Sequence, residues 1–249
     1  MKSTLDEIIA DVLESMPMKL DIYAVQLAGS DFKCWTTNTF YLTDNSPLIL
    51  NGVEYKVDSF SQDEYIILKG ASSPFKGVYN IPNLKYVWGR FNQVNIETAR
   101  KKSSNILPML WRFDLESRTV NLDDNANAST GNTRLFFIQT SNFESYQTKT
   151  DYTKVLNPLE AYSTLFIKYL KKHRLVGKLS SATMIKHPKF LTSNGSVGKE
   201  ENSNVFDRYV SAVELTISLP IRVDMSCKTR FIPVSEGRAF SQGFDEGYS

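Results

Sequence analysis

The sequence has little of the chemistry on which most enzymes and metalloproteins depend. Its 249 residues include two cysteines, Cys34 and Cys227, and two histidines, His173 and His187. The cysteines lie far apart and outside the spacing of a zinc site or redox motif, which argues against a disulfide framework and fits a reducing compartment. No serine or cysteine occurs in a nucleophile-elbow context that could use either histidine, which we interpret as surface residues. We therefore predict that the protein is not an enzyme and that it binds neither a metal nor a cofactor.

Phosphate-binding loops and long apolar runs are missing as well. The stretch from Gly70 to Gly77 does not end in the Gly-Lys-Ser/Thr sequence whose amides and lysine hold phosphates. The acidic pairs Asp63-Glu64 and Asp123-Asp124 occur in turn-like contexts without a third ligand at calcium-loop spacing, so we interpret them as solvated carboxylates. Because no apolar run is long enough to cross a bilayer or to act as a signal sequence, we expect a soluble chain without membrane contact.

A large excess of one charge is also absent. The 29 basic and 27 acidic side chains leave a formal net charge of +2, which does not favour binding to nucleic acid over the whole surface. The best local basic patch consists of Lys168, Lys171, Lys172 and Arg174. These cations either complement the dipole at the end of a helix or contact phosphates, and a DNA-binding module using this patch is our alternative function.

The chain is rich enough in apolar residues, at 41%, to form a substantial core. In the first half, helical periodicity predicts a helix over residues 4–16 that ends at Pro17. Alternation and turn residues then predict strands over 20–28, 32–42, 47–50, 53–60 and 65–68. The pair Asn51-Gly52 is typical of a two-residue hairpin turn, in which both positions need a positive φ.

Residues 71–91 combine loop-forming proline and glycine with many aromatic rings. We predict an irregular segment here and select Phe75, Tyr79, Tyr86 and Trp88 as candidate interface residues. Two interpretations remain open: the rings pack over the core of their own domain, or they dock on a neighbouring subunit.

The second half alternates strands with helices. A short helix is predicted over residues 92–102, and a solvent-exposed turn region over 121–132. Strands are predicted over 106–113, over 134–140 with both faces buried, over 183–187, and over 213–223 with one apolar and one polar face. Pro220 in the last of these indicates an edge position or a bulge.

The strongest helix signal runs from Asn157 to Arg174. Asn157 has the character of an N-cap, Pro158 follows at the first helical position, and Glu160 stands three residues after the cap. Apolar residues recur at three- and four-residue spacing, so one face of this helix requires a surface to cover.

The tail from residue 224 to 249 loses periodicity and carries glycine, serine and isolated rings. Disorder and an extended arm that orders against a partner are both open interpretations. The rings Phe231, Phe240 and Phe244 favour the arm, and we add them to the candidate interface.

Together these elements predict an α+β fold with a mixed, mostly antiparallel sheet packed by one long amphipathic helix. We divide the chain into a β-rich N-terminal half (1–91), an α+β core (92–223) and an extended C-terminal arm (224–249). One integrated domain followed by the arm is the expected organisation.

Four stretches support a family resemblance: Ile106-Leu-Pro-Met-Leu-Trp-Arg-Phe113, Arg134-Leu-Phe-Phe-Ile-Gln139, Leu156-Asn-Pro-Leu-Glu160 and Asn204-Val-Phe-Asp-Arg-Tyr-Val-Ser-Ala-Val-Glu-Leu215. Weaker similarity occurs in Asn51–Val57 and Tyr65–Gly70. In these stretches and in the order of its elements, the chain resembles the connector and tail-completion, tail-terminator-like proteins of tailed bacteriophages. The similarity is greatest to the crAss-like group that infects Bacteroidetes, and residues 71–91 and the tail depart from it.

The resemblance implies a virion structural protein of the phage neck or tail, assembled in the host cytoplasm. Its subunits would form a homo-oligomeric ring that links the portal to the tail through contacts with other neck or tail proteins. Packaged DNA would pass through the channel without sequence-specific binding, which agrees with the nearly neutral net charge.

Overall fold

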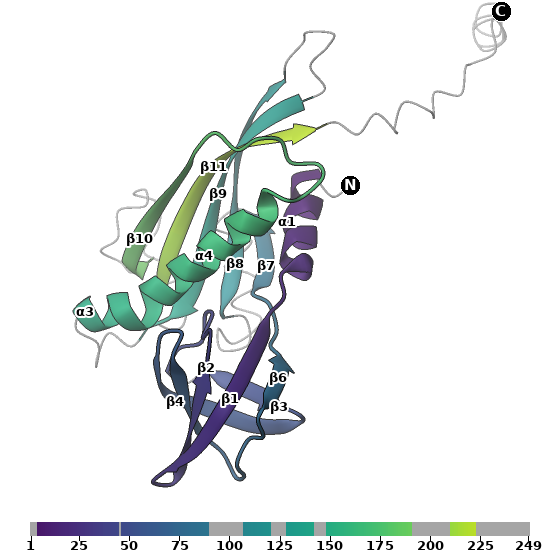
Figure 1. Ribbon diagram of the computed structural model, residues 1–249. Coiled ribbons are helices and arrows are strands. Elements are labelled where there is room, and N and C mark those ends of the chain that lie inside the picture. Colours follow the sequence, from purple (N-terminus) through teal and green to yellow (C-terminus); the bar gives the residue numbers. More distant parts are fainter. Residues whose placement is uncertain are drawn as a thin grey trace, which may run out of the picture.

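The computed structural model describes residues 4–44, 46–89, 107–120, 128–141, 148–190 and 210–222. In these ranges the chain forms two β-sheets with helices packed beside them (Figure 1). The α+β class and the mostly antiparallel pairing predicted from the sequence are confirmed. The prediction of one sheet is wrong, because the strands divide between a six-stranded and a five-stranded sheet.

The first half of the chain builds the six-stranded sheet, in the order β3-β4-β5-β2-β1-β6. Its strands are β1 (Lys19–Ala28), β2 (Asp31–Thr36), β3 (Pro47–Leu50), β4 (Val53–Ser61), β5 (Tyr65–Lys69) and β6 (Gly77–Asn80). The predicted turn at Asn51-Gly52 is confirmed, since both residues have positive φ values of 51° and 81°. β2 ends earlier than predicted, where the Thr39 N–H donates to Asp63 Oδ1 at 2.9 Å and draws the chain out of the sheet.

The second half builds most of the five-stranded sheet, in the order β10-β11-β9-β8-β7. Its strands are β7 (Lys85–Gly89), β8 (Met109–Val120), β9 (Ala128–Thr140), β10 (Ala182–Phe190) and β11 (Val210–Arg222). β7 pairs with β8 in parallel and the other pairs are antiparallel, so this sheet is mixed as predicted. The continuous apolar run Leu135–Ile138 is buried, which confirms the prediction for the centre of β9.

Two predicted irregular segments contain strands. Residues 71–91 include β6 and β7, and these strands join different sheets, which explains the proline and glycine between and before them. Residues 128–132 belong to β9 and pair with β11 up to Ala128–Arg222, so the predicted turn region is at least five residues too long. The predicted helix over 92–102 lies outside the described residues, as does the tail.

The long helix begins earlier than predicted. Helix α3 (Thr148–Asp151) continues through a π-helical turn, Tyr152–Leu156, into α4 (Asn157–Leu170). Asn157 is therefore not an N-cap: its φ and ψ of −66° and −43° are helical, and its N–H donates to Tyr152 O. Proline is tolerated at position 158 because it directly follows the π turn, where the regular ladder of hydrogen bonds is already interrupted.

The helix lies diagonally across one face of the five-stranded sheet (Figure 1). Its buried face includes the predicted Leu159, Tyr162 and Phe166, which are at most 1% exposed. Before the π turn, Asp151 Oδ2 accepts a hydrogen bond of 2.9 Å from the buried Ser211 hydroxyl on β11. The helix is thus held to the sheet by apolar packing along α4 and by a polar contact at its start.

Helix α1 (Thr4–Ser15) begins where predicted, ends one residue before the predicted residue 16, and packs against α4. Its predicted apolar residues Leu5, Ile8, Ile9, Val12 and Leu13 are buried. They belong to one continuous apolar cluster with side chains of the six-stranded sheet, α4 and the α4-covered face of the five-stranded sheet. A second cluster, which includes Trp111 and Phe136, lies on the opposite face of the five-stranded sheet.

Pro220 lies in the interior strand β11, at a position where only one side of the strand is paired. β11 pairs with β9 along its whole length, whereas its pairing with β10 ends at Ile217, three residues before Pro220. The Pro220 carbonyl accepts a hydrogen bond of 2.7 Å from the Gly177 N–H, on the side that β10 does not reach. The missing N–H of proline faces this same side, so it costs no hydrogen bond of the β9–β11 ladder.

Candidate interaction surfaces

The structure separates the candidate rings of residues 71–91 into exposed and buried ones. Phe75 is 78% exposed and Trp88 is 50% exposed. Tyr79 is buried, and its hydroxyl donates to the Phe75 carbonyl at 2.5 Å. Tyr86 is half-buried and packs against the main core cluster. Tyr79 and Tyr86 thus pack on the core of their own chain, and docking of the exposed Phe75 and Trp88 on a neighbouring subunit stays a prediction. Phe231, Phe240 and Phe244 lie outside the described residues.

Phe75 precedes β6 at one edge of the six-stranded sheet, and further exposed apolar side chains occur on β6 and on the neighbouring β1. β6 pairs with only the first part of β1, from Lys19–Asn80 to Ile22–Gly77. On β1, Tyr23 is the first residue after this pairing ends, and on β6, Val78 is the second residue. Tyr23, Val78 and Leu27, farther along β1, are all more than half exposed. We call Tyr23, Leu27, Phe75 and Val78 the β1–β6 corner.

The β1–β6 corner also has an open strand edge. From Tyr23 to Ala28, β1 pairs with β2 on one side, and no described strand pairs with its other side. Figure 1 shows β1 running past β6 toward the turn that leads to β2. Sequence alternation correctly predicted this strand, but it could not predict that β6 covers only half of it.

A second exposed apolar surface lies on β10, at the edge of the five-stranded sheet (Figure 1). Met184 and Ile185 are 36% and 47% exposed. Met184 contacts Ser163 of α4, so Ile185 points to the opposite face of the sheet. The regular pairing of β10 with β11 runs from Ala182 to His187 and is then interrupted before Phe190. No described strand pairs with the outer side of β10.

A buried ionic cluster lies beneath Trp88 and joins α1 to the five-stranded sheet. Arg112 Nε lies 2.9 Å from Asp6 Oδ1, and Arg112 Nη2 donates to Asp6 Oδ2 at 3.1 Å. The Tyr86 hydroxyl donates to Asp6 Oδ1, and burial together with this hydrogen bond to the carboxylate raises the pKa of Tyr86. We call Asp6, Tyr86 and Arg112 the α1 cluster. Its residues lie far apart in sequence, so no local pattern predicts it.

A second ionic cluster lies on the opposite face of the same sheet. Arg134 Nε donates to Glu214 Oε1 at 2.7 Å, and His187 Nε2 lies 2.8 Å from Glu214 Oε2. We call Arg134, His187 and Glu214 the sheet cluster. The prediction that His187 is a surface residue is wrong, since its side chain is 28% exposed and packs beside the rings of Phe136 and Phe190.

The partners of Glu214 favour its ionised form. Burial by itself raises the pKa of Glu214, but hydrogen bonds from Arg134 and His187 and the charges of both residues outweigh burial, so the pKa lies below its usual value. Sequence alternation placed Glu214 on a polar, wet face, yet its side chain is only 6% exposed. The cluster lies in a sheet rather than in a described cleft, and we assign it a structural role.

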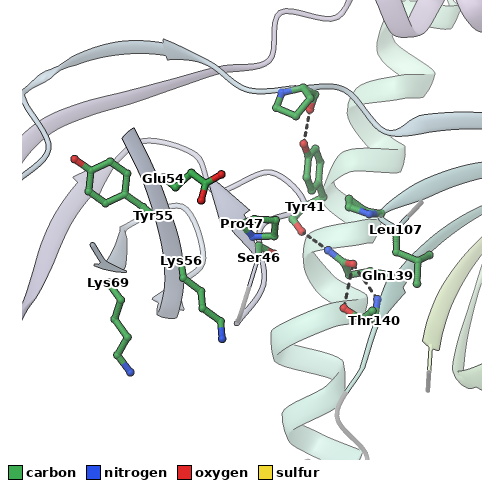
Figure 2. Close-up of a pocket in the computed structure, with 12 residues that line it drawn as sticks. Tyr41, Ser46, Pro47, Glu54, Tyr55, Lys56, Lys69, Leu107, Gln139 and Thr140 are labelled. Atoms are coloured by element: carbon green, nitrogen blue, oxygen red, sulfur yellow. Dashed lines mark hydrogen bonds between the residues drawn. The ribbon is translucent and has the colours of Figure 1, made fainter. Parts of the chain in front are cut away.

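A cavity of about 610 Å³ lies between the six-stranded sheet and one end of the five-stranded sheet, where Gln139 and Thr140 end β9 (Figure 2). Its apolar wall includes Tyr41, Pro47, Tyr55, Leu107 and Pro108. Gln139 donates to the Tyr41 carbonyl across the cavity wall at 3.3 Å, as Figure 2 shows. Burial raises the pKa of Tyr41, whose hydroxyl donates to the Pro82 carbonyl.

The charged side chains of the cavity are Glu54, Lys56 and Lys69. Lys56 and Lys69 face each other across β4 and β5, and Lys69 forms an ion pair with Asp58. The hydrogen bond and charge of Asp58 raise the pKa of Lys69. This arrangement balances charge without placing a nucleophile beside a base, so it gives no basis for a catalytic step.

The basic patch lies at the end of α4. Lys168, Lys171, Lys172 and Arg174 are exposed, and Lys172 Nζ lies 5.4 Å from the centre of the Tyr169 ring. His173 Nε2 lies 3.6 Å from Asp11 of α1. The helix itself ends at Leu170, four residues earlier than predicted, so part of the patch lies on the following turn.

The remaining polar candidates within the described ranges have structural partners, and Asp123-Asp124 lies outside these ranges. Asp63 binds the backbone and hydroxyl of Thr39, and Glu64 accepts a hydrogen bond of 2.7 Å from Ser61. Burial raises the pKa of the Cys34 thiol to about 12, so this cysteine is a neutral core residue. Within the described ranges, no three His, Cys, Asp or Glu side chains gather where they could hold a metal ion.

Comparison with known proteins adds no assignment to these surfaces. No family model, curated protein or solved structure matches this chain. None of the helices in the described part of the chain is long and apolar enough to cross a membrane.

Proposed function

We propose that this protein is a ring-forming structural subunit of a phage virion, part of the connector that links the portal to the tail. The sequence resemblance to phage connector and tail-completion proteins supports this role. In this proposal copies of the chain assemble in the host cytoplasm, contact other neck or tail proteins and surround a channel through which DNA passes. The subunit acts by mechanical fit and not by catalysis.

The observation that carries the proposal is the presence of two different exposed apolar surfaces. One is the β1–β6 corner and the other is the outer side of β10 with Met184 and Ile185. The two surfaces belong to different sheets and have different sequences. Contact between two unlike surfaces repeats from copy to copy and forms a ring when the rotation closes. Open strand edges with apolar side chains are also the features that proteins cover by association.

The oligomeric state of the purified full chain tests this proposal. We expect mass photometry and electron microscopy to reveal closed rings. Ile185→Lys places a charge on the β10 edge and should shift the population to monomers. Ile49→Lys is the matched control, because Ile49 is also exposed on an edge strand, β3, but lies outside both surfaces. A strict monomer at high concentration that binds no portal or tail protein would contradict the proposal.

The alternative is a DNA-binding module, which the exposure of the four basic side chains after Ile167 favours. This alternative predicts an affinity for duplex DNA that falls steeply with salt. Replacing Lys168, Lys171 and Lys172 by Glu should then abolish a gel shift, whereas a channel subunit should give little shift before or after the change.

A further inference from the structure

The open edge of β1 is suited to backbone pairing and not only to apolar contact. β1 and β2 are joined through Gly29-Ser30, and Ala28 pairs with Asp31 at the end of the hairpin. In a two-residue hairpin this closing pair is hydrogen-bonded, so hydrogen-bonded pairs recur at Gln26 and Ala24. The N–H and C=O groups of Val25 and Leu27 consequently point to the side where no described strand lies.

The outer side of β10 offers the complementary edge. The regular part of β10, Ala182 to His187, contains six residues, and the open part of β1, Tyr23 to Ala28, also contains six. The break before Phe190 and the proline at position 188 stop regular pairing beyond this length. Exposed Ile185 on β10 and exposed Leu27 on β1 supply apolar side chains to such a pair.

We propose that Tyr23–Ala28 of one copy pairs as a β-strand with Ala182–His187 of a second copy. This inference rests on the proposed function and specifies the contact through which one subunit joins the next. The strand that pairs with the open part of β1 comes from a second copy, because the edge of matching length, on β10, belongs to this same chain and lies in its other sheet. The contact joins unlike edges, so each copy keeps one free edge for the next copy, as a ring requires. The backbone hydrogen bonds supply affinity and the apolar side chains set the register.

Two substitutions of one residue separate backbone pairing from side-chain contact. Leu27→Pro removes the N–H that faces the partner and leaves the β1–β2 hydrogen bonds in place. Leu27→Thr is the matched control, which removes a similar apolar area and keeps the N–H. We expect Leu27→Pro to weaken association measured by mass photometry about ten-fold more than Leu27→Thr, as the loss of one or two backbone hydrogen bonds implies. Equal weakening by the two variants would overturn the pairing.

A second measurement does not depend on the folding of a variant or on ring formation. A fluorescent peptide with the sequence of residues 181–187 should bind the unaltered full chain, and binding should protect the Val25 and Leu27 amides from hydrogen exchange. The same peptide with proline in place of Ile185 should not bind. Binding without protection of these amides, or no binding at all, would overturn the inference.

If rings form but the amides exchange freely, the proposed function stands and this contact fails. If the peptide binds but rings never form, the contact stands and the ring proposal fails.

Discussion

The two ionic clusters on opposite faces of the five-stranded sheet differ in their access to water. In the α1 cluster the side chains of Arg112 and Asp6 are 2% and 6% exposed. In the sheet cluster Glu214 is equally buried, but Arg134 is 40% exposed. The first cluster joins a helix to a sheet across 106 positions of sequence, whereas the second connects neighbouring strands. An arginine–carboxylate pair therefore has a different energetic role in each cluster. When its carboxylate is removed, the partly exposed Arg134 can be hydrated, whereas the buried Arg112 cannot.

The largest effect is expected from Asp6→Ala. This change takes the Asp6 carboxylate away from the buried Arg112 guanidinium and removes the acceptor of the Tyr86 hydroxyl. We expect the free energy of unfolding to fall by about 3–5 kcal/mol, measured by urea denaturation. Asp58→Ala is the control, since Asp58 pairs with the exposed Lys69 and its loss should leave the urea midpoint unchanged. Equal midpoints for the two variants would remove the distinction between buried and exposed pairs.

A smaller effect is expected from Glu214→Gln. The amide keeps the shape of the side chain and part of its hydrogen bonding, and the half-exposed Arg134 can bind water instead. We expect a loss of about 1 kcal/mol in the free energy of unfolding. A loss as large as that of Asp6→Ala would show that water does not reach the sheet cluster.

The pH dependence of this difference follows from the lowered pKa of Glu214. A carboxyl whose pKa is lower in the folded state contributes stability above its usual value of 4.5, and this contribution disappears as pH falls through the folded pKa. The stability advantage of the unaltered protein over Glu214→Gln should therefore be full at pH 7 and shrink under acid conditions below 4.5. Urea denaturation at pH values from 7 to about 3 measures it. An advantage that grows with acidity would contradict the lowered pKa.

The smallest effect is expected where Trp88 covers the α1 cluster. The Arg112 guanidinium carbon lies 5.7 Å from the centre of the Trp88 ring. Trp88→Leu removes this cation–π contact and should lower the free energy of unfolding by about 0.5–1 kcal/mol. Trp88→Phe keeps an aromatic ring and should lose less. If both variants match the unaltered protein in a thermal melt, the ring does not stabilise Arg112.

Local signals in the sequence predicted the elements that depend on local causes. The positive φ values at Asn51 and Gly52 and the burial of Leu135–Ile138 follow from residue type alone. The start of the long helix was predicted wrongly, because Asn157-Pro158 has the residues of a helix start while a π turn lets the helix run through them. β6 and β7 were missed because they are short strands of four and five residues that lie among proline and glycine.

The candidate surfaces were harder to predict than the fold. Phe75, Tyr79, Tyr86 and Trp88 were selected together as candidate interface residues, but only Phe75 and Trp88 are exposed, whereas Tyr79 and Tyr86 lie inside or at the core. Exposure at Leu27 depends on where β6 stops pairing, and exposure at Ile185 depends on the edge position of β10, and both are properties of a whole sheet. The contact between Asp6 and Arg112 depends on the packing of α1, for which no pattern in either segment gives a signal.

The π turn at Tyr152–Leu156 has the geometry of an α-helix into which one extra residue has been inserted. Removing one residue from this turn would restore regular α-helical hydrogen bonding and rotate α3 by about 100° relative to α4. Asp151 would then leave the Ser211 hydroxyl and point away from β11. The extra residue therefore sets the rotation of the first helical turn relative to α4. As a result, both Asp151 at the start of the helix and the apolar side chains along it face the five-stranded sheet.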